Sequence, residues 1–231
     1  MSEFIDVTSS DGKFRAYCAR PAAKTAPAVV VLQEIFGINA DLKETCEWLA
    51  RQGFIAVCPD LFWRMEPGVC MSKLDDAEWQ KGFQFYQRFD REHGVADIGA
   101  TLEAARKLPG CSGKVGVTGF CLGGLMTFLA AARLSPDAAA EYYGGETDKY
   151  VAESSKIRCP TVIHLAEADE YMPPEAQRKI SETVKSNPRI TVHTYPGCWH
   201  AFARHNGAHY NAAAAEQANS RTVELFRKSL L

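Results

Sequence analysis

Short apolar runs that alternate with longer helical patterns constrain this fold more than any other feature of the sequence. Residues 28–32 and 54–58 are apolar at every position and too short for helices. Strands that are apolar on both faces are typical of a parallel sheet covered by helices on two sides. We therefore predict an α/β protein with a mostly parallel sheet. The predicted strands of this type are 28–32, 54–58, 114–118, 138–143, 161–165 and 190–195.

The intervening segments have helical spacing of their apolar residues, and the chain up to Arg20 alternates as an antiparallel edge does. No repeat, low-complexity tract or linker divides the sequence, so we expect one domain over residues 1–231. The predicted helices are 41–52, 75–89, 97–108, 122–133, 173–186 and 212–230.

Charge and cysteine usage exclude several classes of protein. The chain has 26 Lys and Arg against 28 Asp and Glu, which gives no electrostatic reason to expect nucleic acid or an anionic membrane as partner. No apolar run approaches the roughly 20 residues of a membrane span, and the acidic N-terminus is unlike a signal peptide. The eight cysteines contain no C-x-x-C pair. We expect a cytoplasmic protein with reduced thiols and without metal or other cofactor.

One glycine-flanked turn carries the strongest chemical signal. Gly119-Phe120-Cys121-Leu122-Gly123 lies between a predicted strand and a predicted helix. This is the G-x-S-x-G nucleophile elbow with cysteine in place of serine. The helix N-terminus favours a thiolate at Cys121, and the Leu122 N–H faces a developing oxyanion. The alternative is a tight turn with an inert buried cysteine.

An elbow of this kind requires an acid and then a histidine at later strand ends. Asp169 follows strand 161–165, with Glu167 and Glu170 as rivals, and His200 follows strand 190–195. The alternative is that the acids are solvated loop residues. A metal site is not expected from the late histidines because Asn206-Gly207 would interrupt the helix it requires.

Three segments together resemble the dienelactone hydrolase (carboxymethylenebutenolidase) family of α/β-hydrolases. They are Gln33-Glu34-Ile35-Phe36-Gly37, Phe120-Cys121-Leu122-Gly123-Gly124 and His200-Ala201-Phe202-Ala203-Arg204. The resemblance covers nearly the whole chain. It implies an α/β-hydrolase fold in which Cys121 is the nucleophile, His200 the base and Asp169 its orienting acid.

The resemblance also implies a set of supporting residues. Backbone N–H groups of Ile35 and Leu122 would form the oxyanion hole. Glu34 would contact the thiol and Arg204, and Arg204 would neutralise Glu34 or bind a substrate carboxylate. The alternatives are a loop residue for Glu34 and a surface arginine for Arg204. Further substrate-binding positions would be Phe36, Trp79, Phe83, Tyr142 and Trp199.

The sequence departs from the family pattern in the predicted pocket. The family's carboxylate-binding arginine falls on Trp79 and its companion tyrosine on Phe83, while Trp199 stands where a small residue is usual. We expect a more aromatic and less anion-selective pocket. Lys81 or Arg64 could supply a replacement cation, the alternative for both being a solvated face.

These observations favour a monomeric hydrolase that cleaves a small-molecule lactone or activated ester through a thioester on Cys121. One alternative is a promiscuous carboxylesterase, thioesterase or phosphotriester hydrolase with the same machinery. A distant alternative is a non-catalytic relative that binds a small molecule.

Overall fold

The sheet of this protein is built from the short apolar runs. The computed structural model describes residues 2–231, and within them the chain forms eight strands and seven α-helices. Strands β3, β4, β6 and β7 are buried at every position, as expected for strands covered on both faces. The strands are β1 (Ser2–Thr8), β2 (Lys13–Ala19), β3 (Ala26–Leu32), β4 (Ile55–Pro59), β5 (Cys111–Phe120), β6 (Ala138–Tyr142), β7 (Thr161–Ala166) and β8 (Ile190–Tyr195).

The strand order is β1-β2-β4-β3-β5-β6-β7-β8. β1 and β2 form an antiparallel hairpin, and β2 pairs antiparallel with β4. The pairs β3–β4, β6–β7 and β7–β8 are parallel. The prediction of a mostly parallel sheet with an antiparallel edge near the N-terminus is therefore confirmed.

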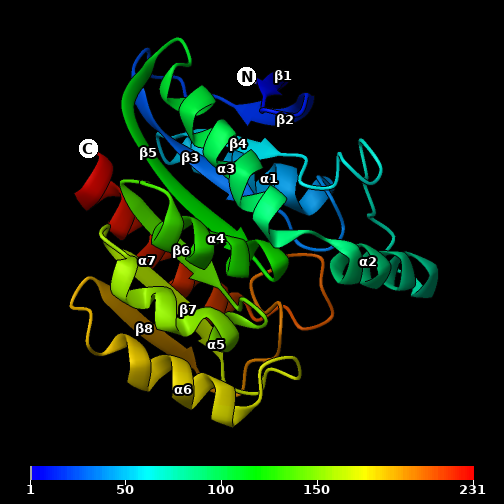
Figure 1. Ribbon diagram of the computed structural model, residues 1–231, viewed down its shortest axis with the longest axis vertical. Coiled ribbons are helices and arrows are strands. Elements are labelled where there is room, and N and C mark those ends of the chain that lie inside the picture. Colours follow the sequence, from blue (N-terminus) through cyan, green and yellow to red (C-terminus); the bar gives the residue numbers. More distant parts are fainter. Residues whose placement is uncertain (1) are drawn as a thin grey trace. The chain divides into compact units, whose positions relative to one another are not determined.

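The chain divides into two compact units, one ending at Gly116 and the other beginning at Val117. In the first unit, α1 contacts β4 and β2, while α3 contacts β1, β3 and β4. In the second, α4 packs on β6, and α7 packs on β6 and β7. Figure 1 shows α7 behind the strands of this second unit and α4 and α6 in front of them, so helices cover both faces there. The helices are α1 (Ala40–Arg51), α2 (Asp76–Arg88), α3 (Arg91–Arg106), α4 (Leu122–Arg133), α5 (Thr147–Tyr150), α6 (Pro174–Val184) and α7 (Ala212–Leu230), with a 3-10 helix at Val151–Lys156.

Two helix predictions need correction. α3 begins at Arg91, not at residue 97, because the Asp90 carboxylate accepts hydrogen bonds from the N–H groups of Glu92 and His93 and caps the helix there. His93 therefore lies in the first turn of α3. The short helices over residues 147–156 were not predicted, because four or six residues are too few to show a periodic pattern.

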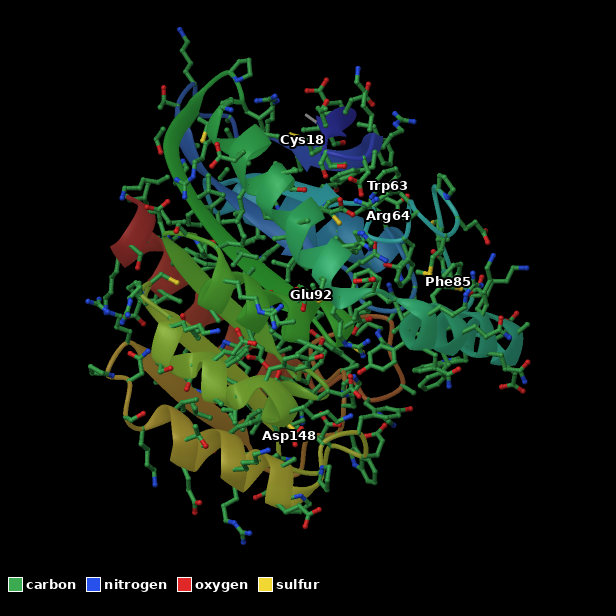
Figure 2. The ribbon with its side chains drawn as sticks, in the orientation of Figure 1. Cys18, Trp63, Arg64, Phe85, Glu92 and Asp148 are labelled. Atoms are coloured by element: carbon green, nitrogen blue, oxygen red, sulfur yellow. The ribbon has the colours of Figure 1, made fainter. Side chains whose placement is uncertain are left out.

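A buried polar cluster anchors the loop after β4. Trp63 Nε1 donates to Asp97 Oδ2 at 2.8 Å, and Arg64 binds both oxygens of the same carboxylate. Figure 2 shows Trp63 and Arg64 next to each other on this loop. A buried carboxylate is stable only where it is paired and hydrogen-bonded, and Asp97 meets both conditions.

Candidate active site

Cys121 occupies a strained turn between β5 and α4. Its φ is 56° and its ψ is −115°, a backbone conformation that residues with a side chain rarely adopt. The Cys121 N–H donates to the carbonyl of Tyr142 at 3.1 Å, which ties the turn to the end of β6. The side chain is partly exposed. The turn thus presents a thiol at the N-terminus of α4, as the sequence motif predicts.

Close packing beneath this turn explains a glycine in the first turn of α4. A Cβ added to Gly124 would lie 2.3 Å from the carbonyl oxygen of Tyr142 and 2.9 Å from Cα of Gly144. Both neighbours are backbone atoms that cannot rotate away. The helix can therefore approach β6 this closely only without a side chain at this position.

We expect Gly124→Ala to destabilise the protein by about 1–3 kcal/mol, because overpacking forces backbone shifts. Urea unfolding measures the change in free energy. Gly113→Ala is the comparison, since no atom lies within 4 Å of an added Cβ there and the cost arises only from its positive φ. Equal losses in the two variants would contradict the packing explanation.

His200 and Asp169 form a buried pair. His200 Nδ1 lies 2.9 Å from Asp169 Oδ2 and 3.1 Å from Oδ1, and the two residues are 4% and 6% exposed. Asp169 follows β7 and also accepts the Tyr171 N–H at 2.9 Å. A carboxylate on Nδ1 fixes the imidazole tautomer and directs Nε2 outward from the pair.

The rival carboxylates serve other purposes. Glu170 Oε2 accepts the backbone N–H of His200 at 3.2 Å, and Glu167 Oε2 accepts the N–H of Gly197 at 2.8 Å. Both brace the loop that carries His200, and neither bonds its ring. Asp169 is the carboxylate that reaches the imidazole.

The electrostatics link His200 to Cys121 within the same unit. Burial by itself disfavours protonation of the imidazole, but negative charge at the Cys121 sulfur and the bond to Asp169 outweigh it and raise the pKa of His200 to about 10. Nε2 of His200 has no hydrogen-bond partner within residues 2–231. The interaction between the Cys121 sulfur and the His200 ring is the pairing of nucleophile and base that thiol activation requires.

Aromatic rings surround the imidazole. The rings of Tyr143 and Tyr171 meet His200 edge-on at centroid distances of 5.1 and 4.9 Å. Trp199 is 51% exposed and lies 5.6 Å from the ring of His209. Aromatic side chains therefore line the loops around His200, and the more aromatic substrate pocket stays a prediction.

Tyr142 does not take the substrate-binding place that was predicted for it. Its side chain is 1% exposed, and its hydroxyl bonds Asn219 and Thr222 of α7. Successive residues of an extended chain point to opposite faces, so the side chains of Tyr142 and Tyr143 point in different directions at the end of β6. The ring that lies against His200 belongs to Tyr143.

The predicted residues of the first unit form their own packed segment. Glu34, Ile35 and Phe36 follow β3 and are 8%, 3% and 1% exposed. Hydrogen bonds between Ile38 N and Val69 O, and between Met71 N and Phe36 O, fasten this segment to the following loop. Glu34 is therefore a buried loop residue directly before a turn, and its predicted catalytic role stays a prediction.

Helix α2 brings the two predicted aromatic substitutions onto this segment. Trp79 meets Phe36 edge-on at 4.9 Å and Phe83 at 5.9 Å. Phe83 is 37% exposed. The position before Phe83 is a glycine because a Cβ there would lie 3.0 Å from Cδ1 of Ile35.

Neither proposed replacement cation is available. Arg64 is bonded to Asp97 and to Asp11, and Lys81 pairs with Glu66 at 2.7 Å. Arg204, by contrast, is 5% exposed, which contradicts the alternative of a surface arginine. Its backbone N–H bonds the carbonyl of Ala201, within the segment that follows His200.

The remaining cysteines are mostly buried packing residues, with two exceptions. Cys70 is exposed and Cys111 is partly exposed. Cys70 lies on a loop and Cys111 at the first position of β5, and neither place is covered. The buried cysteines are Cys18, Cys46, Cys58, Cys159 and Cys198.

Among the described residues 2–231, no group of three or more His, Cys, Asp or Glu side chains could hold a metal ion. His209, which was considered as a ligand with His200 and His205, instead has Nδ1 3.1 Å from the carbonyl of His200. In the same part of the chain, no helix is both long and apolar enough to cross a membrane.

The sequence model of the dienelactone hydrolase family matches residues 14–230. The chain belongs to the dienelactone hydrolase family. It is 39% identical over 225 residues to a carboxymethylenebutenolidase of Pseudomonas putida, covering 97% of this chain and 95% of the relative. Identity to carboxymethylenebutenolidase 1 of Cupriavidus pinatubonensis is also 39%, over 97% of this chain and 96% of that one.

A solved structure supports the same fold. A dienelactone hydrolase-like promiscuous phosphotriesterase from metagenomic libraries has a TM-score of 0.84 and 22% identity, over 100% of this chain and 99% of the other. The α/β-hydrolase fold predicted from the motifs is confirmed.

Sequence reasoning missed three residues around the site of this dienelactone hydrolase family member. Tyr143 and Tyr171 contact the His200 ring, and Glu141 is buried within β6 directly before the two tyrosines. Position next to a strand end was the available signal for Tyr143 and Glu141. Nothing in the sequence distinguishes Tyr171 from other loop tyrosines.

Proposed function

We propose that this dienelactone hydrolase family member cleaves lactones or activated carboxylic esters through a thioester on Cys121. The observation that carries the proposal is the joint arrangement of the Cys121 turn and the buried His200–Asp169 pair in one unit. The interaction with the Cys121 sulfur, which raises the pKa of His200, supports the same pairing. The names of the relatives give the substrate class.

The reaction would proceed in two halves. The Cys121 sulfur attacks the carbonyl carbon while its proton resides on His200 Nε2, and the C–O bond to the leaving group breaks as that proton passes to the leaving oxygen. A water molecule then attacks the thioester and gives its proton to His200, the C–S bond breaks, and the returning thiolate completes the cycle. Asp169 holds the tautomer and stabilises the imidazolium.

The oxyanion would be stabilised by backbone N–H groups of Leu122 and Ile35. Leu122 is the first residue of α4, and the N–H groups of a first helical turn have no partner inside the helix. One such donor is typically worth about 3 kcal/mol in the transition state. Glu34 is proposed as the second carboxylate of the site and Arg204 as its charge partner or as a carboxylate-binding group.

We propose that the substrate presents an aromatic or apolar group. Support comes from the half-exposed Trp199 and from Tyr171, whose ring lies 4.9 Å from that of His200. Arg64 and Lys81 are engaged with carboxylates and do not replace the missing family arginine. The pocket is then less selective for anions than that of a typical family member.

We also propose that the enzyme acts as a cytoplasmic monomer. All eight cysteines are free, which suits a reducing compartment and keeps the nucleophile available. The sheet edge at β1 is largely exposed and carries the polar residues Ser2, Glu3, Asp6 and Thr8. Charged side chains on an edge strand oppose its pairing with a second chain.

Mass spectrometry of the enzyme during turnover tests the mechanism. We expect an adduct at Cys121 equal in mass to the acyl group, first with p-nitrophenyl acetate and then with a dienelactone. A Cys70→Ser background removes the exposed competing thiol. Turnover without a Cys121 adduct would contradict the proposal.

The same experiment separates the alternatives. Faster hydrolysis of aryl esters than of dienelactone would favour a general esterase, and a phosphoryl adduct with a phosphotriester would favour the activity named for the metagenomic relative. Binding without any turnover would indicate a non-catalytic relative.

A further inference from the structure

Glu141 is a buried carboxyl group that the proposed mechanism does not use. It lies on β6 after three alanines, and the residue is 0% exposed. Its Oε1 accepts the hydroxyl of Thr147 at 2.7 Å and the N–H of Gly144, while Oε2 has no partner among residues 2–231. A buried acid without a cation is costly in its charged form. Such a residue needs an explanation.

The carboxyl spans the turn that follows β6. The chain leaves the strand over Tyr142–Gly144. The Glu141 carboxyl accepts hydrogen bonds from Gly144, the last residue of this segment, and from Thr147, three residues later. A Cβ on Gly144 would lie 2.4 Å from Glu141 Oε1 and 2.6 Å from the Leu125 nitrogen. Glu141 is therefore in direct packing contact with the segment that lies against the first turn of α4.

This turn holds both partners of the proposed reaction. The carbonyl of Tyr142 accepts the Cys121 N–H at 3.1 Å. Tyr143 has a positive φ of 36°, donates its N–H to His164 O at 2.9 Å, and places its ring 5.1 Å from the His200 ring. A tyrosine does not adopt that backbone conformation without external restraint.

We propose that Glu141 is a positioning residue. Its carboxyl clamps the Tyr142–Gly144 turn and thereby fixes the positions of Cys121 and His200 relative to each other. The inference rests on the proposed function of these two residues. The clamp works in the protonated form, because only an acceptor oxygen is needed toward Thr147 and Gly144. Burial raises the pKa of Glu141 to about 8, which keeps the group neutral at neutral pH. The groups that bond the carboxyl carry no charge.

Matched substitutions test the clamp. Glu141→Gln keeps the acceptor oxygen and removes the ionisation, so its kcat should stay within about twofold of wild type at pH 7. Glu141→Ala removes the clamp and should lower kcat by roughly tenfold or more with little change in KM. The reason is that displacing reacting groups by about 1 Å greatly lowers the rate of the chemical step. Glu153→Ala, which breaks an ion pair with Arg133 in the same unit, should leave kcat unchanged.

The pH dependence supplies a second readout. The folded-state pKa of about 8 lies above the ordinary glutamate value of 4.5. Folding therefore takes up a proton between these pH values, and wild-type stability falls as pH rises through them. Glu141→Gln lacks this loss. Its urea-unfolding midpoint, relative to wild type, should therefore rise between pH 5 and pH 8.5.

Two results would overturn the inference. One is a folded Glu141→Ala variant with wild-type kcat, and the other is a Glu141→Gln variant as slow as Glu141→Ala, which would mean that the charge itself is required. Trapping of the acyl-enzyme distinguishes a failure of the proposed thioester mechanism from a failure of the Glu141 clamp. Absence of a Cys121 adduct in wild type rejects the proposed function, whereas equal acylation rates in wild type and Glu141→Ala reject only the clamp.

Discussion

Replacement of Cys121 by alanine is expected to lower kcat for p-nitrophenyl acetate by at least about a thousandfold, the typical cost of removing a nucleophile that acts as one unit with its base. The loss follows because Cys121 is the residue at the strained turn whose sulfur interacts with His200. Steady-state kinetics with active-site titration measures the effect. KM is uninformative here, since residual turnover would follow a different path.

The same substitution has a second expected effect, on His200 itself. Negative charge at the Cys121 sulfur is the leading cause that raises the pKa of His200 to about 10 against the opposing effect of burial. Without the sulfur, the pKa should fall substantially, so that the ring titrates nearer to neutral pH. NMR of the ring protons across a pH series would report this. A His200 pKa that is the same in both proteins would contradict the proposed pairing.

A buried cysteine close in sequence supplies the matched control. Cys198 lies two residues before His200 and is 3% exposed. Cys198→Ala removes a similar volume from the same loop and leaves the Cys121 turn untouched. We expect its kcat to stay within a few-fold of wild type, so a large loss in both variants would point to loop damage and not to a missing nucleophile.

Asp169→Asn is expected to lower kcat by about 10³–10⁴-fold with the fold intact. The asparagine keeps the shape, but its amide group can donate toward Nδ1, which favours the wrong imidazole tautomer. It also no longer stabilises the imidazolium. Pre-steady-state measurement of acylation and deacylation should show both halves slowed, because His200 transfers a proton in each.

Glu170→Gln is the comparison for Asp169→Asn. Glu170 is the next residue, and its carboxylate binds the His200 backbone N–H at 3.2 Å, not the ring. The amide of glutamine can accept the same bond, so activity should be nearly unchanged. If the two substitutions were equally harmful, the assignment of Asp169 as the orienting acid would fail.

The parts of the site that follow chain order were predictable from the sequence. A glycine-flanked cysteine between a strand and a helix has few structural solutions, and the elbow then dictates where an acid and a histidine must follow. Asp169 was expected after β7 on these grounds, and its bond to His200 agrees with that expectation. The apolar strand runs were equally predictive, because a strand buried on both faces leaves little room for polar residues.

Features that depend on which way a side chain turns were not predictable. The sequence cannot distinguish the adjacent residues Tyr142 and Tyr143. The ring of Tyr143 is the one that reaches His200, because β6 ends at Tyr142 and Tyr143 has a positive φ. Glu141 reads as a polar residue at a strand end, although the structure buries it completely. The start of α3 depended on a capping bond from Asp90, which lies before any apolar periodicity.

The exposed indole of Trp199 gives this enzyme an optical reporter. Its ring is half in solvent, lies 5.6 Å from the His209 ring at a tilt of 39°, and belongs to the residue directly before His200. An indole in that position experiences each change of charge on the neighbouring imidazole and each arrival of an aromatic acyl group. Its emission would therefore record acylation and deacylation as separate phases in a stopped-flow trace, with no dye attached and no chromogenic leaving group in the substrate.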